Sequence, residues 1–188
     1  MGREPSVVSV RDLSSSATCY PVATGRDRPE AAIDGDTPSQ KTERKKVGLL
    51  TSVVIADFSD AKAIEQSSNP VETWEGFDAR GIDPVKLEQL QLLVQKESST
   101  EQADVTFPLL AGADEGPWVF GFPQGFTALL AKLTPPTLLQ VTRQWLETDE
   151  LLMDNWQLQE TRTVLTSLQC VAQKALAQNR SLIICISM

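Results

Sequence analysis

The sequence ends with an unbroken run of five apolar residues, 182–186 (LIICI), followed by Ser187 and Met188. A strand of this composition needs cover on both faces, because an exposed edge of this kind would aggregate. A second β-branched run, residues 49–56 (LLTSVVIA), opens the region that contains every Phe and Trp. We therefore expect both runs in one sheet, which would bring the ends of the folded domain together.

Aromatic residues divide the chain near residue 46. Residues 1–46 contain no Phe or Trp and one tyrosine, Tyr20, whereas Ser, Thr, Pro, Gly, Arg and Asp are frequent. Burial of so little apolar surface cannot offset the conformational entropy that the chain would lose on folding. We therefore predict a disordered N-terminal tail over 1–46. Residues 47–188 are long enough to bury a core of their own. We predict a single compact α+β domain there.

Helical periodicity fills most of the interval between the two apolar runs. The clearest helix start is Asp83 before Pro84, which suits an N-cap followed by a proline in the first turn. A long helix over 156–178, with an apolar stripe that opens at Leu158, should be the main cover of the sheet. Residues 118–122 (WVFGF) predict a further strand. The fold class is therefore α+β, a small sheet that includes the first and last strands of the domain and is covered by several helices.

Charge is distributed unevenly along the chain. The predicted tail carries 8 Lys and Arg against 7 Asp and Glu, whereas residues 47–188 carry 9 against 18. A domain with twice as many acids as bases lacks the basic face that phosphate recognition needs, so we expect no nucleic-acid partner. The same charge permits a basic protein partner.

Targeting and redox signals are few. No stretch approaches the ~20 apolar residues of a membrane helix, and the first residues contain no signal-peptide core, so we expect no membrane association and a cytoplasmic protein. Cys19, Cys170 and Cys185 show no CxxC spacing, and their odd number suits a reducing compartment. We expect Cys170 and Cys185 to behave as small buried apolar side chains.

The sequence contains no histidine. This absence removes the usual catalytic triads, His general bases and His-ligated zinc sites. The glycines of GFDARG and GADEG match neither a dinucleotide-binding motif nor a phosphate loop. An acidic cluster lacks the order of a calcium-binding loop and reads as a solvated helix junction. The cluster consists of Glu147, Asp149, Glu150 and Asp154. We predict no cofactor, no metal and no catalytic residue.

The densest polar turn of the domain holds Asp78, Arg80 and Asp83 around Gly81. Two carboxylates with an intervening guanidinium could orient a ligand or shift a carboxyl pKa. The alternative is a helix cap with a surface ion pair. We treat Asp78, Arg80 and Asp83 as candidate binding residues.

Tryptophan supplies the remaining candidates, because this residue is enriched at binding hot spots. Trp74, Trp118 and Trp156 lie at predicted element boundaries, where a ring could anchor a partner or pack at the end of the sheet. Trp145 lies on an apolar helical stripe, so we predict that it belongs to the core.

Four pieces of the domain carry a resemblance: TSVVIAD, WEGFDARGIDPVKLEQL, GPWVFGFP, and the long helix followed by LIICISM. In order and spacing, residues 47–188 resemble small bacterial proteins of unknown function that are similar in plan to the YfbM-like family. The resemblance implies an α+β fold and no particular reaction. Some families of this size act as immunity proteins that neutralise a toxin, and the resemblance permits such a role.

We therefore predict a non-enzymatic interaction protein, in particular an immunity-type inhibitor of a basic partner. Two alternatives stay open. A small carboxylate-using enzyme or ligand-binding protein would need a pocket in which Asp78 and Asp83 converge with raised pKa values. A structural subunit of a homo-oligomer would need a large apolar surface patch that closes by symmetry. The sequence predicts no oligomeric state.

Overall fold

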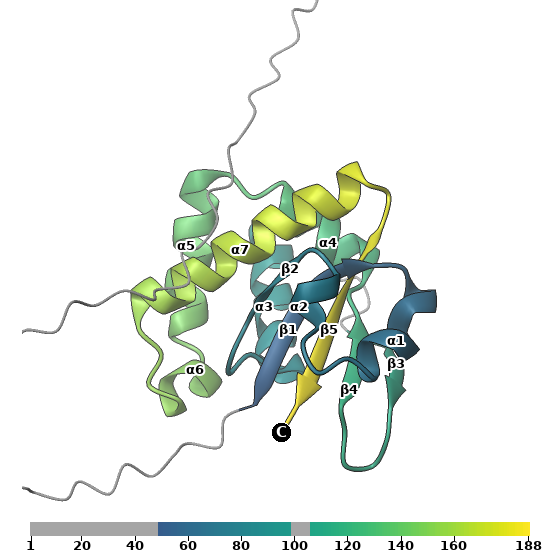
Figure 1. Cartoon of the computed structure of the whole chain (residues 1–188). Helices are drawn as coiled ribbons and strands as arrows, with labels where there is room; N and C mark the ends of the chain where they lie inside the picture. Colours follow the sequence, from purple (N-terminus) through teal and green to yellow (C-terminus); the bar gives the residue numbers. More distant parts are fainter. Residues whose placement is uncertain (1–48, 99–105) are drawn as a thin grey trace, which may run out of the picture. The chain divides into compact units, whose positions relative to one another are not determined.

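The structure is a computed structural model that describes residues 49–98 and 106–188 (Figure 1). The chain divides into two units, Met1–Lys41 and Thr42–Met188, and every described residue belongs to the second. The predicted disordered tail over 1–46 lies outside the described residues. The domain boundary near residue 46 therefore stays a prediction.

One antiparallel sheet of five strands organises the described residues, with the order β2-β1-β5-β4-β3. β1 and β5 pair along their whole length, from Leu50 opposite Ser187 to Ala56 opposite Ser181. The prediction that the first and last strands of the domain are neighbours is confirmed, and β5 is the middle strand. The strands are β1 Leu50–Ala56, β2 Gly76–Asp78, β3 Leu109–Gly112, β4 Trp118–Gly121 and β5 Ser181–Ser187.

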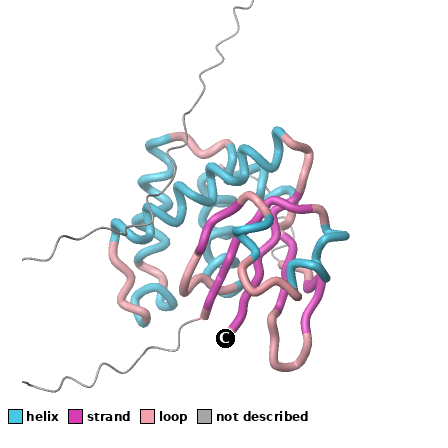
Figure 2. Tube along the Cα trace, in the orientation of Figure 1, coloured by secondary structure: helices cyan, strands magenta, loops and turns pink. Residues whose placement is uncertain are grey.

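Helices of unequal size lie on the two faces of this sheet (Figures 1 and 2). The longer helices, α3, α4, α5 and α7, share one face with the short α6. The other face, here called the second face, is covered by the short helices α1 and α2. The predicted α+β class is therefore confirmed. The helices are α1 Ala61–Glu65, α2 Pro70–Thr73, α3 Pro84–Glu97, α4 Gln124–Ala131, α5 Pro135–Leu146, α6 Asp149–Met153 and α7 Leu158–Ala177, with a 3-10 turn at Phe58–Asp60 before α1.

The apolar run of β5 supplies core residues to both faces, because side chains alternate along a strand. Leu182, Ile184 and Ile186 pack among the long helices. Ile183 and Cys185 pack beneath α1 and α2. All five side chains are buried, so the expectation that this strand is covered on both faces is confirmed.

The start of α3 follows the predicted capping chemistry. The Lys86 amide donates a hydrogen bond of 2.9 Å to Asp83 Oδ1, and Pro84 occupies the first turn. The helix then buries Leu87, Leu90 and Val94 completely.

The long helix α7 is also confirmed, with one correction at its start. Its buried stripe begins at Thr161 and continues through Leu165 and Leu168. Leu158 is 45% exposed, so the prediction that the stripe opens there is wrong. Leu158 is the first residue of α7 and precedes the first buried residue by almost one turn.

Candidate functional site

Asp83, one of the three candidates in the polar turn, is held by α3. In addition to capping the helix, Asp83 Oδ2 lies 2.6 Å from Lys86 Nζ. The Lys86 side chain is only 7% exposed and also reaches Asp154 Oδ2 at 2.9 Å. Burial lowers the pKa of Lys86, but hydrogen bonds to Asp83 and Asp154 raise it by more, so the net shift is upward. Asp83 therefore has the role of a helix cap and ion-pair partner.

Asp78 and Arg80 lie instead on the second face. Backbone pairing with β1 continues beyond β2, since Ala79 N donates to Thr51 O at 2.7 Å and Gly81 N donates to Leu49 O at 3.4 Å. The extended backbone turns Ala79 into the core and sends the side chains on either side of it to the opposite face. Asp78 and Arg80 are thus neighbours on one surface, and Asp83 is apart from them.

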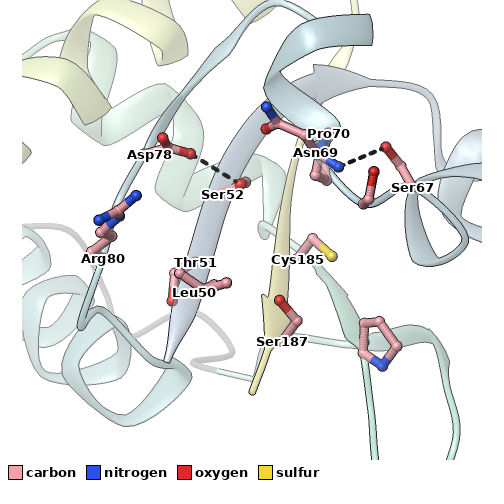
Figure 3. Close-up of a pocket in the computed structure, with 12 residues that line it drawn as sticks. Leu50, Thr51, Ser52, Ser67, Asn69, Pro70, Asp78, Arg80, Cys185 and Ser187 are labelled. Atoms are coloured by element: carbon pink, nitrogen blue, oxygen red, sulfur yellow. Dashed lines mark hydrogen bonds between the residues drawn. The ribbon is translucent and has the colours of Figure 1, made fainter. Parts of the chain in front are cut away.

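A cavity of about 230 Å³ opens on the second face beside these two residues (Figure 3). Its floor is formed by β1 and β5, one wall by Asp78 and Arg80, and the opposite wall by the loop between α1 and α2. Sequence reasoning found Asp78 and Arg80 and missed the other residues. The lining residues are Leu50, Thr51, Ser52, Ser67, Ser68, Asn69, Pro70, Asp78, Arg80, Pro117, Cys185 and Ser187.

Hydrogen bonds order part of the cavity lining. Ser52 Oγ donates to Asp78 Oδ1 at 3.3 Å, which follows from the register that places these two residues opposite each other. On the far wall, Asn69 N donates to Ser67 Oγ at 3.3 Å. Within the described part of the chain, the Arg80 guanidinium makes no ion pair or hydrogen bond. The cavity thus combines one held carboxylate with one uncommitted guanidinium.

The two cysteines of the domain differ. Cys185 is a buried free thiol, and burial, followed by the nearby charge of Glu65, raises its pKa to about 11. The prediction of a small buried side chain is confirmed for Cys185. Cys170 on α7 is half-buried, so the same prediction is wrong for Cys170.

The raised pKa predicts a thiol that reacts slowly in the native protein. Because reagents attack the thiolate, Cys185 should remain largely unmodified by Ellman's reagent at pH 8 and react at once in urea. Mass spectrometry of the labelled peptides separates Cys185 from the other cysteines. Rapid labelling of Cys185 in the folded protein would show that the thiol is accessible and reactive.

The boundary tryptophans are all half-buried. Trp74 packs on the core cluster of the second face, whereas Trp118 and Trp156 pack against the cluster among the long helices. Trp145 is fully buried, and its Nε1 donates to Lys86 O at 3.0 Å, so the core prediction is confirmed. Trp156 stands out among the boundary tryptophans because the residues on both sides of it, 152–155 and 157–160, are all exposed.

The segment around Trp156 forms a surface that sequence reasoning missed, here called the acidic corner and defined as residues 147–160. The sequence indicated a solvated junction, and the structure places helix α6 there, leading into α7 (Figure 1). Leu152 is 56% exposed and Met153 is 81% exposed, close in sequence to the exposed Leu158. Five acids and no Lys or Arg occupy this segment: Glu147, Asp149, Glu150, Asp154 and Glu160.

Within 49–98 and 106–188, no group of three or more His, Cys, Asp or Glu side chains is placed to hold a metal ion. No helix in these ranges combines the length and apolar character needed to cross a membrane.

Comparison with known proteins found no matching family model, no similar curated protein and no similar solved structure. The resemblance to the YfbM-like family is not tested by these comparisons and stays a prediction. The two surfaces described above, the cavity and the acidic corner, therefore indicate what the domain can bind.

Proposed function

We propose that the domain is a non-enzymatic interaction protein that binds a basic protein partner at the acidic corner. The observation that carries the proposal is the exposure of Leu152, Met153 and Leu158 among five carboxylates. Exposed apolar groups rimmed by polar residues are typical of protein-binding surfaces. An immunity-type inhibitor in the cytoplasm of a bacterium is the particular role that we propose, in line with the resemblance to the YfbM-like family.

The charge of the acidic corner supports a basic partner. Within the described residues, Asp154 is the only one of the five carboxylates with a cation partner, the nearly buried Lys86. Asp149 and Glu150 lie in the first turn of α6, where the helix dipole favours negative charge. A partner that brings Lys or Arg to this surface gains complementary charge, which accelerates association and favours one partner over others.

The apolar residues of the corner supply affinity. Complete burial of a Leu or Met side chain contributes about 1.5 to 3 kcal/mol, so three such side chains can form the centre of an interface. Methionine adapts to irregular surfaces because its side chain is unbranched and polarisable. Trp156, half-buried in the same segment, packs against the core.

The state of the acid–base groups supports a binding function over catalysis. Asp83 is committed to Lys86 and the start of α3, and it does not line the cavity with Asp78. The Cys185 thiol is protonated at neutral pH. The convergent carboxylates that the enzyme alternative requires are thus not brought together.

A capture experiment from native bacterial lysate tests the proposal when it includes surface variants. We expect the full chain to retain a basic protein, and the double variant Leu152→Ser/Met153→Ser to lose it. The variant Asp149→Asn/Glu150→Gln should retain less, and its difference from the unmodified chain should shrink as salt is added, because salt screens the charges. Leu109→Ser, which changes an exposed leucine on the distant strand β3, is the matched control and should bind as the unmodified chain.

The outcome of the variants decides the proposal, not capture alone. A captured protein that binds the Leu152→Ser/Met153→Ser variant as well as the unmodified chain would place the interface elsewhere. Retention of acidic proteins only, or no protein that distinguishes the variants, would contradict a basic partner at this corner. Circular dichroism of each variant checks that the fold is intact.

A further inference from the structure

We propose that the cavity on the second face is a binding site for a small α-amino acid with a polar side chain. This site is separate from the acidic corner and does not depend on the protein partner proposed there. It is built from β1, β5, the residues after β2 and the loop between α1 and α2 (Figure 3).

The size of the cavity limits the ligand. Its 230 Å³ lies below the range of about 300 to 1,000 Å³ that is typical of drug-sized ligands. A small amino acid fits this limit, whereas a nucleotide does not.

Arg80 supplies the recognition of a carboxylate. The domain has twice as many acids as bases, yet the Arg80 guanidinium has no carboxylate partner among the described residues and lines the cavity. A guanidinium presents its N–H groups in a planar fork that matches both oxygens of a carboxylate. An anion in the cavity would therefore find this group uncommitted.

Asp78 supplies the complementary recognition of an ammonium group. It is two residues from Arg80 on the same side of an extended backbone, so the two positions are about 6.6 Å apart. No ion pair joins Asp78 to Arg80 in the described structure. Two opposite charges at this spacing can each bind one charged group of a single zwitterion.

The remaining lining residues suit a short polar side chain. Ser52 and Ser187 lie on the floor, and Ser67 and Asn69 face Asp78 from the opposite wall (Figure 3). Hydroxyl and amide groups can both donate and accept hydrogen bonds. Among the amino acids of this size, serine, threonine and asparagine match such a lining best.

Isothermal titration calorimetry of the full chain with L-serine, L-threonine and L-asparagine tests the proposal. We expect at least one of the three to bind. Ethanolamine lacks the carboxylate of serine, and 3-hydroxypropionate lacks its ammonium group. Each should bind at least about tenfold more weakly than L-serine. Arg80→Gln and Asp78→Asn should each weaken binding by about tenfold or more.

Controls separate the cavity from charge effects elsewhere. Arg143→Gln changes an exposed arginine on α5, and Asp149→Asn changes the acidic corner, so both should leave amino-acid affinity unchanged. Ser187→Ala changes the floor without altering charge and should weaken binding, which keeps the test valid if Asp78→Asn lowers the melting temperature. The proposal fails if none of the three amino acids binds at about 10 mM. It also fails if Arg80→Gln binds normally, or if either serine analogue binds as well as serine.

Discussion

A chain that ends at Arg180, and so lacks β5, will not form a cooperative folded structure. β5 pairs with β1 on one side and with β4 on the other, so its loss divides the sheet. Complete burial of an apolar side chain contributes about 1.5 to 3 kcal/mol, and five such residues would be lost. The lost burial energy is therefore comparable to the total stability of about 5 to 15 kcal/mol that is typical of a domain.

Far-ultraviolet circular dichroism and a urea melt measure this effect directly. The matched control is a chain that ends at Ser187, because Met188 lies beyond β5 and is exposed. This control should unfold cooperatively at the same urea concentration as the full chain. A soluble, monomeric chain that ends at Arg180 and unfolds cooperatively near the urea concentration of the full chain would show that the sheet does not depend on its middle strand.

The sheet and the principal helices follow from sequence signals with a local physical cause. An unbroken apolar run needs cover on both faces, and all five residues of the run at 182–186 are buried. Asp83 before Pro84 sets the start of α3 because the carboxylate satisfies a backbone amide that would otherwise lack a partner. Each of these signals lies within a few residues of the element that it determines.

The cavity depends on tertiary pairing, which local patterns do not contain. Asp78 and Arg80 were visible as a polar turn, but their facing wall comes from Ser67 and Asn69, and Ser187 is added from the end of the domain. The register of β1 against β2 and β5 brings these positions together. Asp83 was grouped with Asp78 by proximity in sequence, and the cap of α3 separates them.

The acidic corner was missed for a different reason. Periodicity assigns Leu158 to the stripe that continues at Thr161 and Leu165, although the helix has only begun at Leu158. Exposure at a helix start depends on where the neighbouring helices end, and α6 is too short to show a period of its own. The available signal is a run of carboxylates without a base, but four of them, Glu147, Asp149, Glu150 and Asp154, are equally typical of a solvated junction.

The substitution Trp145→Ala should destabilise the domain more than any other single change to a tryptophan. Trp145 is completely buried and is the largest fully buried side chain of the described core. Its Nε1 also donates to Lys86 O at 3.0 Å and so links α5 to α3. Truncation of such a residue costs about 3 to 5 kcal/mol through lost contacts and the cavity left behind.

Thermal unfolding followed by circular dichroism measures the cost without depending on tryptophan fluorescence. For a domain of this size, we expect the melting temperature to fall by about 6 to 20 °C. Trp145→Phe keeps most of the apolar volume and removes the hydrogen bond, so its cost should be intermediate. Trp156→Ala, at a half-buried position, should cost less than Trp145→Ala. Truncation of a fully buried side chain leaves a larger cavity than truncation of a half-buried one. A smaller effect of Trp145→Ala than of Trp156→Ala would therefore show that the packing of α5 against α3 is not the centre of the core.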